Sequence, residues 1–234
     1  MKTTKGENLS AAASAAAIIG SLHRNAEGAL VMGQYHFEQR RVLPEYLAEA
    51  EEMCGRIARL QRSGKRRAAQ ALSRKMEALP RSVIAADIAP NLVTDVGAKL
   101  LLDTILAGSA FTASTFMGLK GTGVAVVADT QASHASWLEV GTTNAPQYTA
   151  PRKTVTWSAA AGTGAGARTK ASSSTNTYAI ITTGGTVDGA FLNINGTSAI
   201  DNTTGTLFSA GQFTGGAKTV AVSDTLTVTY SLAI

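Results

Sequence analysis

Between residues 43 and 79 the hydrophobic residues recur in steps of three and four, a spacing that predicts amphipathic helix. The apolar positions on this face are Leu43, Leu47, Ala50, Cys54 and Ile57, followed by Ala68, Leu72, Met76 and Leu79. Pro44 suits the first turn of a helix, and Pro80 ends the pattern. The stretch RSGKRR (62–67) interrupts it, because Gly64 can end one helix and Ser63 can cap the next. The pattern therefore predicts either two antiparallel helices or one long kinked helix.

A further helix and then a series of strands follow in the pattern. Leucines and valines at 92–107 recur at helical spacing, and Gly108 stands where a helix-ending glycine is expected. From Phe111 onward, short β-type runs alternate with turn residues. The candidate strands are 111–119, 123–128, 136–140, 153–159, 177–183, 187–195, 205–213 and 224–234. In the last of these, Leu226, Val228 and Tyr230 alternate with threonines and are predicted to point to one face.

The pattern as a whole predicts an α+β protein, with an N-terminal α-helical segment before an antiparallel β-sandwich of the jelly-roll or immunoglobulin-like type. Composition places the boundary near Pro80–Pro90. Residues 1–90 hold 14 Lys and Arg against 9 Asp and Glu, whereas residues 91–234 hold 7 of each, so the net charge of +5 belongs to the first part. We therefore expect a helical attachment or oligomerisation segment at 1–90 and a β-sandwich domain with a leading short helix at 91–234.

Two stretches of low complexity add to this division. LSAAASAAAIIG (9–20) reads as an Ala-rich helix that packs closely on a partner, with the core of a signal peptide as the alternative. AGTGAGARTKASSSTN (161–176) is expected to be a mobile loop. The chain contains no run of 18 apolar residues, so we expect no insertion into a membrane.

The strongest charge feature is RIARLQRSGKRRAAQALSRK (56–75), in which eight of twenty residues are basic and none is acidic. The candidate partner-binding residues are Arg56, Arg59, Arg62, Lys65, Arg66, Arg67, Arg74 and Lys75. Such a stretch can contact the phosphates of nucleic acid, form a solvated helix face, or meet an acidic partner protein. No aromatic residue is interleaved for stacking on bases, which weakens the interpretation as a nucleic-acid site.

Enzymatic chemistry has one candidate, ADTQASHASWLEV (128–140), which combines Asp129, Ser133, His134 and Ser136. A charge-relay site needs its base within hydrogen-bond reach of the nucleophile, whereas adjacent side chains such as Ser133 and His134 diverge. No Gly-x-Ser-x-Gly elbow surrounds either serine. We expect a turn at Asp129, a packed or capping His134 and a buried Trp137, and no catalytic residues.

Cofactor and metal sites are not predicted either. The chain has one cysteine, Cys54, which suits assembly in a reducing cytoplasm, and its three histidines do not repeat a ligand spacing. GTGAGAR (162–168) is not followed by a helical pattern, so it does not read as a dinucleotide-binding motif.

Three segments resemble a small virion-protein domain of tailed bacteriophages, often described as tail-fibre-like. They are NLVTDVGAKLLLDTILAGSAFTASTFMGL (91–119), ADTQASHASWLEV (128–140) and GTLFSAGQFTGGAKTVAVSDTLTVTYSLAI (205–234). Ser223 stands where that family's pattern has glycine. The resemblance covers residues 91–234 and implies a β-rich, non-enzymatic structural domain of a phage particle.

On this resemblance we expect a short tail fibre or fibre-anchoring appendage that attaches through its N-terminal helices to the portal, adaptor or tail. The expected protein is a homo-oligomer, a trimer first of all, located in the virion after assembly in the bacterial cytoplasm. A capsid decoration protein is the alternative within the same class. A nucleic-acid-binding protein using residues 56–75, and a module that contacts the host surface or its glycans, are alternatives from other classes.

Overall fold

The computed structural model describes residues 32–106, 114–149, 151–163 and 168–233. Contacts between residues divide the chain between Leu30 and Val31, and Val31–Ile234 form one compact unit. The compositional boundary expected near Pro80–Pro90 lies within this unit. The predictions for 9–20 lie outside the described residues, as does the part of the 161–176 loop at 164–167.

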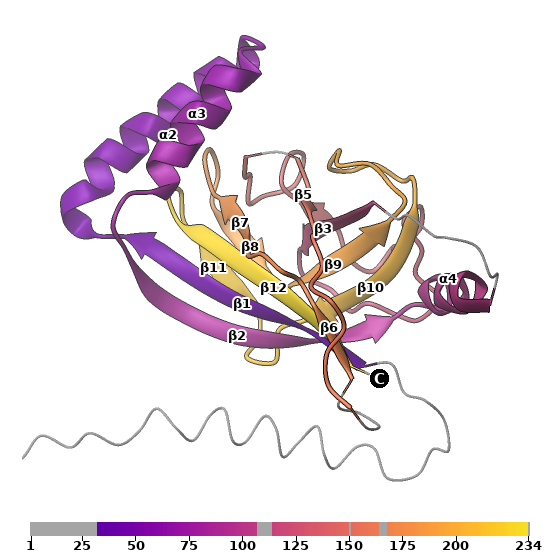
Figure 1. Cartoon of the computed structure of the whole chain (residues 1–234). Helices are drawn as coiled ribbons and strands as arrows, with labels where there is room; N and C mark the ends of the chain where they lie inside the picture. The colour runs from indigo at the N-terminus through magenta and orange to yellow at the C-terminus, as the bar shows by residue number, and fades with distance from the viewer. Residues whose placement is uncertain (1–31, 107–113, 150, 164–167, 234) are drawn as a thin grey trace, which may run out of the picture. The chain divides into compact units, whose positions relative to one another are not determined.

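The main element of the fold is a ten-stranded, largely antiparallel sheet. Eight strands follow the order β4-β3-β9-β10-β2-β1-β12-β6, while β5 pairs with β3 and β7 pairs with β12 (Figure 1). Their bounds are β1 Met32–Val42, β2 Arg81–Val93, β3 Thr115–Lys120, β4 Glu139–Val140, β5 Lys153–Thr154, β6 Thr169–Ala171, β7 Asn176–Ala179, β9 Gly189–Ile194, β10 Thr206–Gln212 and β12 Thr225–Ala233. A separate pair joins β8 (Gly185–Val187) to β11 (Lys218–Val220). Three α-helices accompany this β-rich core among the described residues, so the fold is α+β.

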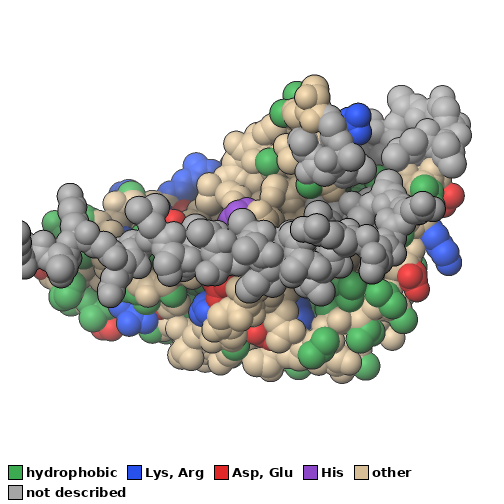
Figure 2. Space-filling model, turned by 90° about the horizontal axis from the view of Figure 1, so that it is seen from below, with side chains coloured by type: hydrophobic (Ala, Val, Ile, Leu, Met, Phe, Trp, Pro, Cys, Tyr) green, Lys and Arg blue, Asp and Glu red, His purple; other side chains and the backbone are tan. Residues whose placement is uncertain are grey.

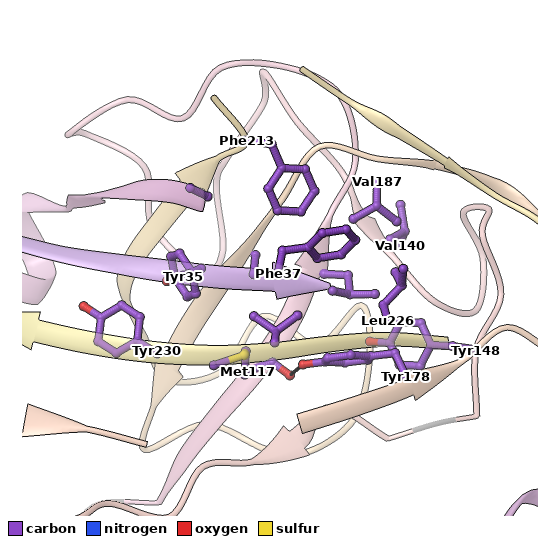
Figure 3. Packing of buried hydrophobic residues seen from close by; sticks show 14 of the residues in the cluster. Tyr35, Phe37, Met117, Val140, Tyr148, Tyr178, Val187, Phe213, Leu226 and Tyr230 are labelled. Atoms are coloured by element: carbon purple, nitrogen blue, oxygen red, sulfur yellow. Dashed lines mark hydrogen bonds between the residues drawn. The ribbon is translucent and has the colours of Figure 1, made fainter. Parts of the chain in front are cut away.

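The sheet curves so that its inner face encloses one large hydrophobic core (Figure 3). Tyr35 of β1 stands opposite Tyr230 of β12, and both rings are buried with centroids 4.8 Å apart. The hydroxyl of Tyr178 on β7 donates to the Met117 carbonyl of β3 at 2.8 Å, which links the two ends of the strand order across the core. The expected alternation in β12 is confirmed, because Leu226, Val228 and Tyr230 are all buried.

Two α-helices lie between β1 and β2 and form a helical hairpin. The 3-10 turn Pro44–Tyr46 leads into α2 (Leu47–Arg62), and α3 (Arg66–Glu77) follows after Gly64, whose φ is +72°. Of the two predicted arrangements, the structure therefore has two separate helices. Ser63 does not cap the second helix as expected, because its hydroxyl donates back to the Leu60 carbonyl at the end of α2.

The same hairpin changes the interpretation of residues 1–90, which were expected to form a separate helical segment. β1 and β2 are long strands that pair with each other from Gln34↔Pro90 to Val42↔Arg81. The Leu43 N–H donates to the Pro80 carbonyl at 3.0 Å, so the helical hairpin begins and ends where this strand pair ends. The helices are thus an insertion in the sheet, and Figure 1 shows them at the opposite end of β1 and β2 from α4.

The third helix, α4, spans Asp95–Leu106, within the predicted range 92–107. It starts later than expected because residues 91–93 pair with β10 as the end of β2. The Thr94 hydroxyl accepts the Gly97 N–H at 3.1 Å and caps the first turn.

Two loop expectations need correction. Residues 123–128, a predicted strand, form none, because the Asp129 carboxylate binds the Val126 N–H and the Val127 carbonyl accepts the Asp95 N–H of α4. These bonds replace strand pairing and leave Val126 and Val127 about half exposed. Conversely, the stretch 161–176 includes β6, which pairs with β12, so its described part is not a free loop throughout.

The helical hairpin is attached to the sheet through a second hydrophobic cluster, which contains the single cysteine. Cys54 is 2% exposed, and the cluster joins it to Ile57 and Met76 of the hairpin and to Ile181 beyond β7. Burial raises the pKa of the Cys54 thiol to about 11. We expect a thiol reagent at pH 8 to modify Cys54 only after denaturation, because the reactive thiolate is both scarce and covered. Rapid labelling of the native chain would show that the hairpin separates from the sheet.

Candidate interaction surface on the helical hairpin

The eight candidate basic residues all lie on the helical hairpin and all are exposed. Arg56, Arg59 and Arg62 belong to α2, and Lys65 precedes α3, which contains the other four. Among the described residues, one ion pair involves this set, between Arg56 and Glu52 at 3.9 Å, one turn apart. Such an exposed pair is weak. The hairpin also contains the glutamates Glu45, Glu49, Glu51, Glu52 and Glu77, so residues 44–77 have a net charge of +3, but no acidic residue lies between positions 53 and 76.

The positions of these residues follow from how the two helices pack. Each helix buries a narrow stripe of small or apolar residues, so the long cationic side chains occupy the remaining faces. The buried residues are Ala50, Cys54 and Ile57 in α2 and Ala69, Ser73 and Met76 in α3. Basic residues in the last turn of each helix, such as Arg62 and Lys75, interact favourably with the helix dipole. Arg66 and Arg67, in the first turn of α3, are not balanced by any acidic residue in that turn.

Partly buried polar contacts hold the base of the hairpin against the sheet. Arg81, the first residue of β2, donates to the Met76 carbonyl of α3 at 2.8 Å and to the Ser223 carbonyl at 2.5 Å. The fully buried Asp224 binds the Arg41 guanidinium through both carboxylate oxygens, at 2.8 and 2.9 Å. These contacts join β1, β2, α3 and the turn before β12 at one place. The hairpin is thereby fixed in direction relative to the sheet that carries it.

Beside the hairpin lies a cleft of about 690 Å³. The hairpin contributes Gln61, Arg66, Ala69 and Gln70 to its wall. The other wall comes from loops of the β-rich part at 141–149, 181–182 and 198–200. Arg66 is the one charged residue among those that line it, and none is acidic.

The predicted turn at 128–140 is an architectural feature with the packing that the sequence suggested. Trp137 is 1% exposed, and its indole N–H donates to the Asp129 carboxylate at 2.9 Å. His134 stacks on the indole with ring centroids 4.0 Å apart, and its Nδ1 lies 3.0 Å from the Trp137 carbonyl. The expectations of a packed His134 and a buried Trp137 are confirmed. Asp129 and His134 are engaged with Trp137, while Ser133 donates its N–H to the Thr130 hydroxyl.

Sequence reasoning did not find the buried ion pairs of the β-rich part. Arg152 and Glu139 form a two-point pair at 2.8 and 2.6 Å, and both side chains are buried. Lys120 lies 3.5 Å from Asp188, and burial lowers the pKa of this lysine. Each partner comes from a different loop or strand, so no local spacing in the sequence could have indicated the pairing.

On the face seen from below, Figure 2 shows Lys and Arg in small separate groups among hydrophobic and uncharged side chains. In the part of the chain that the structure describes, no group of three or more His, Cys, Asp or Glu could hold a metal ion. Within the same residues, no helix is long and apolar enough to cross a membrane.

The hairpin is therefore the place where charge, exposure and a cleft coincide, and it is the candidate site of this chain. Comparison of the chain with models of protein families, with curated proteins and with solved structures found no match.

Proposed function

We propose that this chain is a non-enzymatic structural protein of a tailed-bacteriophage virion, a short tail fibre or fibre-anchoring appendage. In this proposal the α2–α3 hairpin is the helical anchor, and the β-rich part is a sandwich-like body carried outward. The observation that carries the proposal is the exposed run of basic residues at 56–75, which contains no acidic residue and is held by partly buried contacts at one end of the sheet. A rigidly placed charged element suits docking on another virion protein, at the portal, adaptor or tail.

The places of the resembling segments in the fold support this proposal. The segment 91–119 includes α4 and most of β3, and 205–234 includes β10, β11 and β12. The segment 128–140 contains the buried Trp137, which packs against Phe191 of β9 with centroids 5.4 Å apart. Each of the three segments thus contributes strand residues or buried side chains to the β-rich part.

Two alternatives use the same surface. A capsid decoration protein would place the hairpin on the shell instead of the tail. A nucleic-acid-binding protein would use the eight basic residues on phosphates, with affinity that falls steeply with salt. The proposed protein is a homo-oligomer, and a trimer is the proposed oligomeric state. Its β-rich body is then available for contact with the host surface.

Charge reversal on the hairpin tests the proposal. We expect immunogold labelling of particles from a host that carries the gene to mark the tail, and the label to be lost when Arg59, Arg62, Arg66 and Arg67 are all changed to Glu. Four reversals turn attraction to an acidic site into repulsion without touching the buried stripe. Circular dichroism of the purified variant checks that it still folds. Label on the capsid faces would favour decoration, and particles without any label would overturn the proposal.

A further inference from the structure

Among the basic residues of the hairpin, Arg66 differs in its position on α3. In α3 the buried residues Ala69, Ser73 and Met76 recur in steps of three and four. Arg66 stands three residues before Ala69, so it continues the stripe that faces the sheet. At this end of the hairpin the contact with the sheet gives way to the cleft, and Arg66 is exposed there instead of buried.

The chemistry of the cleft is one-sided. Its charged group is the Arg66 guanidinium, which has five N–H donors and no ion-pair partner among the described residues. The amides of Gln61 and Gln70 and the hydroxyls of Thr142 and Thr182 also line it, and no carboxylate does. At the turn of the hairpin, Lys65 directly precedes Arg66 and Arg67 directly follows it. A site of this composition favours a negatively charged, hydrogen-bond-accepting ligand.

The size and position of the cleft indicate what kind of anion it fits. A volume of about 690 Å³ lies in the range of well-formed ligand sites and exceeds what a single small ion fills. The cleft runs between a helical hairpin and the loops of the sheet, where an extended chain can lie with its own backbone groups against glutamine and threonine side chains. Aromatic platforms for nucleobases are absent from the described lining, in which Tyr148 is the one aromatic residue and is 2% exposed.

We propose that this cleft binds an acidic, extended segment of the partner protein, with a carboxylate of that segment paired to Arg66. The inference rests on the proposed function and names the chemistry of the partner at its hairpin surface. Arg66 fixes the position of the segment through a bidentate ion pair with one carboxylate, and the outer basic residues contribute long-range electrostatic attraction. Specificity in this interface therefore comes from Arg66, and the other basic residues contribute only affinity.

A matched pair of variants tests this assignment in the full-length chain. The probes are a labelled oligoglutamate peptide and a labelled oligothymidine with the same number of negative charges, both followed by fluorescence anisotropy at low ionic strength. We expect Arg66→Gln to weaken peptide binding about tenfold, as for loss of a charged hydrogen-bonded pair. Arg67→Gln removes the same charge next to the cleft and is expected to weaken binding about twofold or less, as for an exposed ion pair.

A third variant blocks the cleft without changing charge. Ala199 is exposed and lines the wall that belongs to the sheet, so Ala199→Trp is expected to weaken peptide binding as much as Arg66→Gln. Equal effects of the two arginine variants, or no effect of Ala199→Trp, would overturn the assignment of the cleft. Tighter binding of oligothymidine with the same dependence on Arg66 would make nucleic acid the occupant. In each case the particle-labelling experiment still decides the proposed function independently.

Discussion

Changing Trp137 to alanine is expected to lower the free energy of unfolding by about 3–5 kcal/mol. The indole is almost fully buried, stacks on His134 and packs against Phe191. Its removal opens a cavity and also leaves the buried Asp129 carboxylate without the indole N–H that it accepts at 2.9 Å. Urea denaturation followed by circular dichroism measures the change.

The other tryptophan provides the matched control. Trp157 is only half-buried and meets Tyr230 edge-on with centroids 5.9 Å apart. Since solvent already reaches part of its ring, Trp157→Ala is expected to cost clearly less than Trp137→Ala. Equal losses for the two variants would contradict the packing described for residues 128–140.

The second large effect is expected at the buried pair between Glu139 and Arg152. Glu139 accepts two bonds from the guanidinium and a third, at 2.9 Å, from the Asp201 N–H. Glu139→Ala leaves the fully buried Arg152 charge unpaired, and we expect it to lower the free energy of unfolding by about 3–5 kcal/mol. Chemical denaturation of the single variant gives this value.

A double variant separates two contributions to stability: the attraction within the ion pair and the cost of leaving one buried charge unpaired. Glu139→Leu combined with Arg152→Met removes both charges and keeps much of the volume, so it is expected to be more stable than Glu139→Ala. The exposed pair between Glu38 and Arg40 is the surface control, and Glu38→Ala should change stability by about 1 kcal/mol or less. If the double variant is the least stable of the three, attraction within the pair outweighs its desolvation.

The helical hairpin could be predicted from the sequence, whereas the strands that carry it could not. Its apolar spacing, Pro44, Gly64 and Pro80 are local signals, and each has a local structural role. In β1 the apolar alternation stops after Tyr35 and Phe37, because the next inward position is Gln39, which binds the buried Asp224. A register shift between Gln39 and Arg40 then makes Val42 the next buried residue. A strand whose inner face turns polar for a distant carboxylate has no period that a local pattern can show.

In β2 the misleading signal was Pro90, which marked the expected boundary. The carbonyl of Ile88 accepts the Thr214 N–H on the side away from β1, and the backbone of Pro90 faces that same side. β10 pairs with β2 only at 91–93, so a missing N–H at Pro90 breaks no bond between strands. The candidate site could likewise be predicted only in part. The run of basic residues is visible in the local sequence, whereas the cleft is formed by loops from three distant parts of the chain.

The pairing of β1 with β12 has a consequence for how the protein is made. Met32 stands opposite Ala233 and Arg40 opposite Thr225, so the first described strand pairs with the last. During synthesis, β1 emerges early and must wait for residues 225–233 before this strand pair can form. The helical hairpin, built from neighbouring residues, can fold much sooner. Newly made chains therefore pass through a stage with a formed hairpin on an open sheet, in which docking before completion would compete with folding.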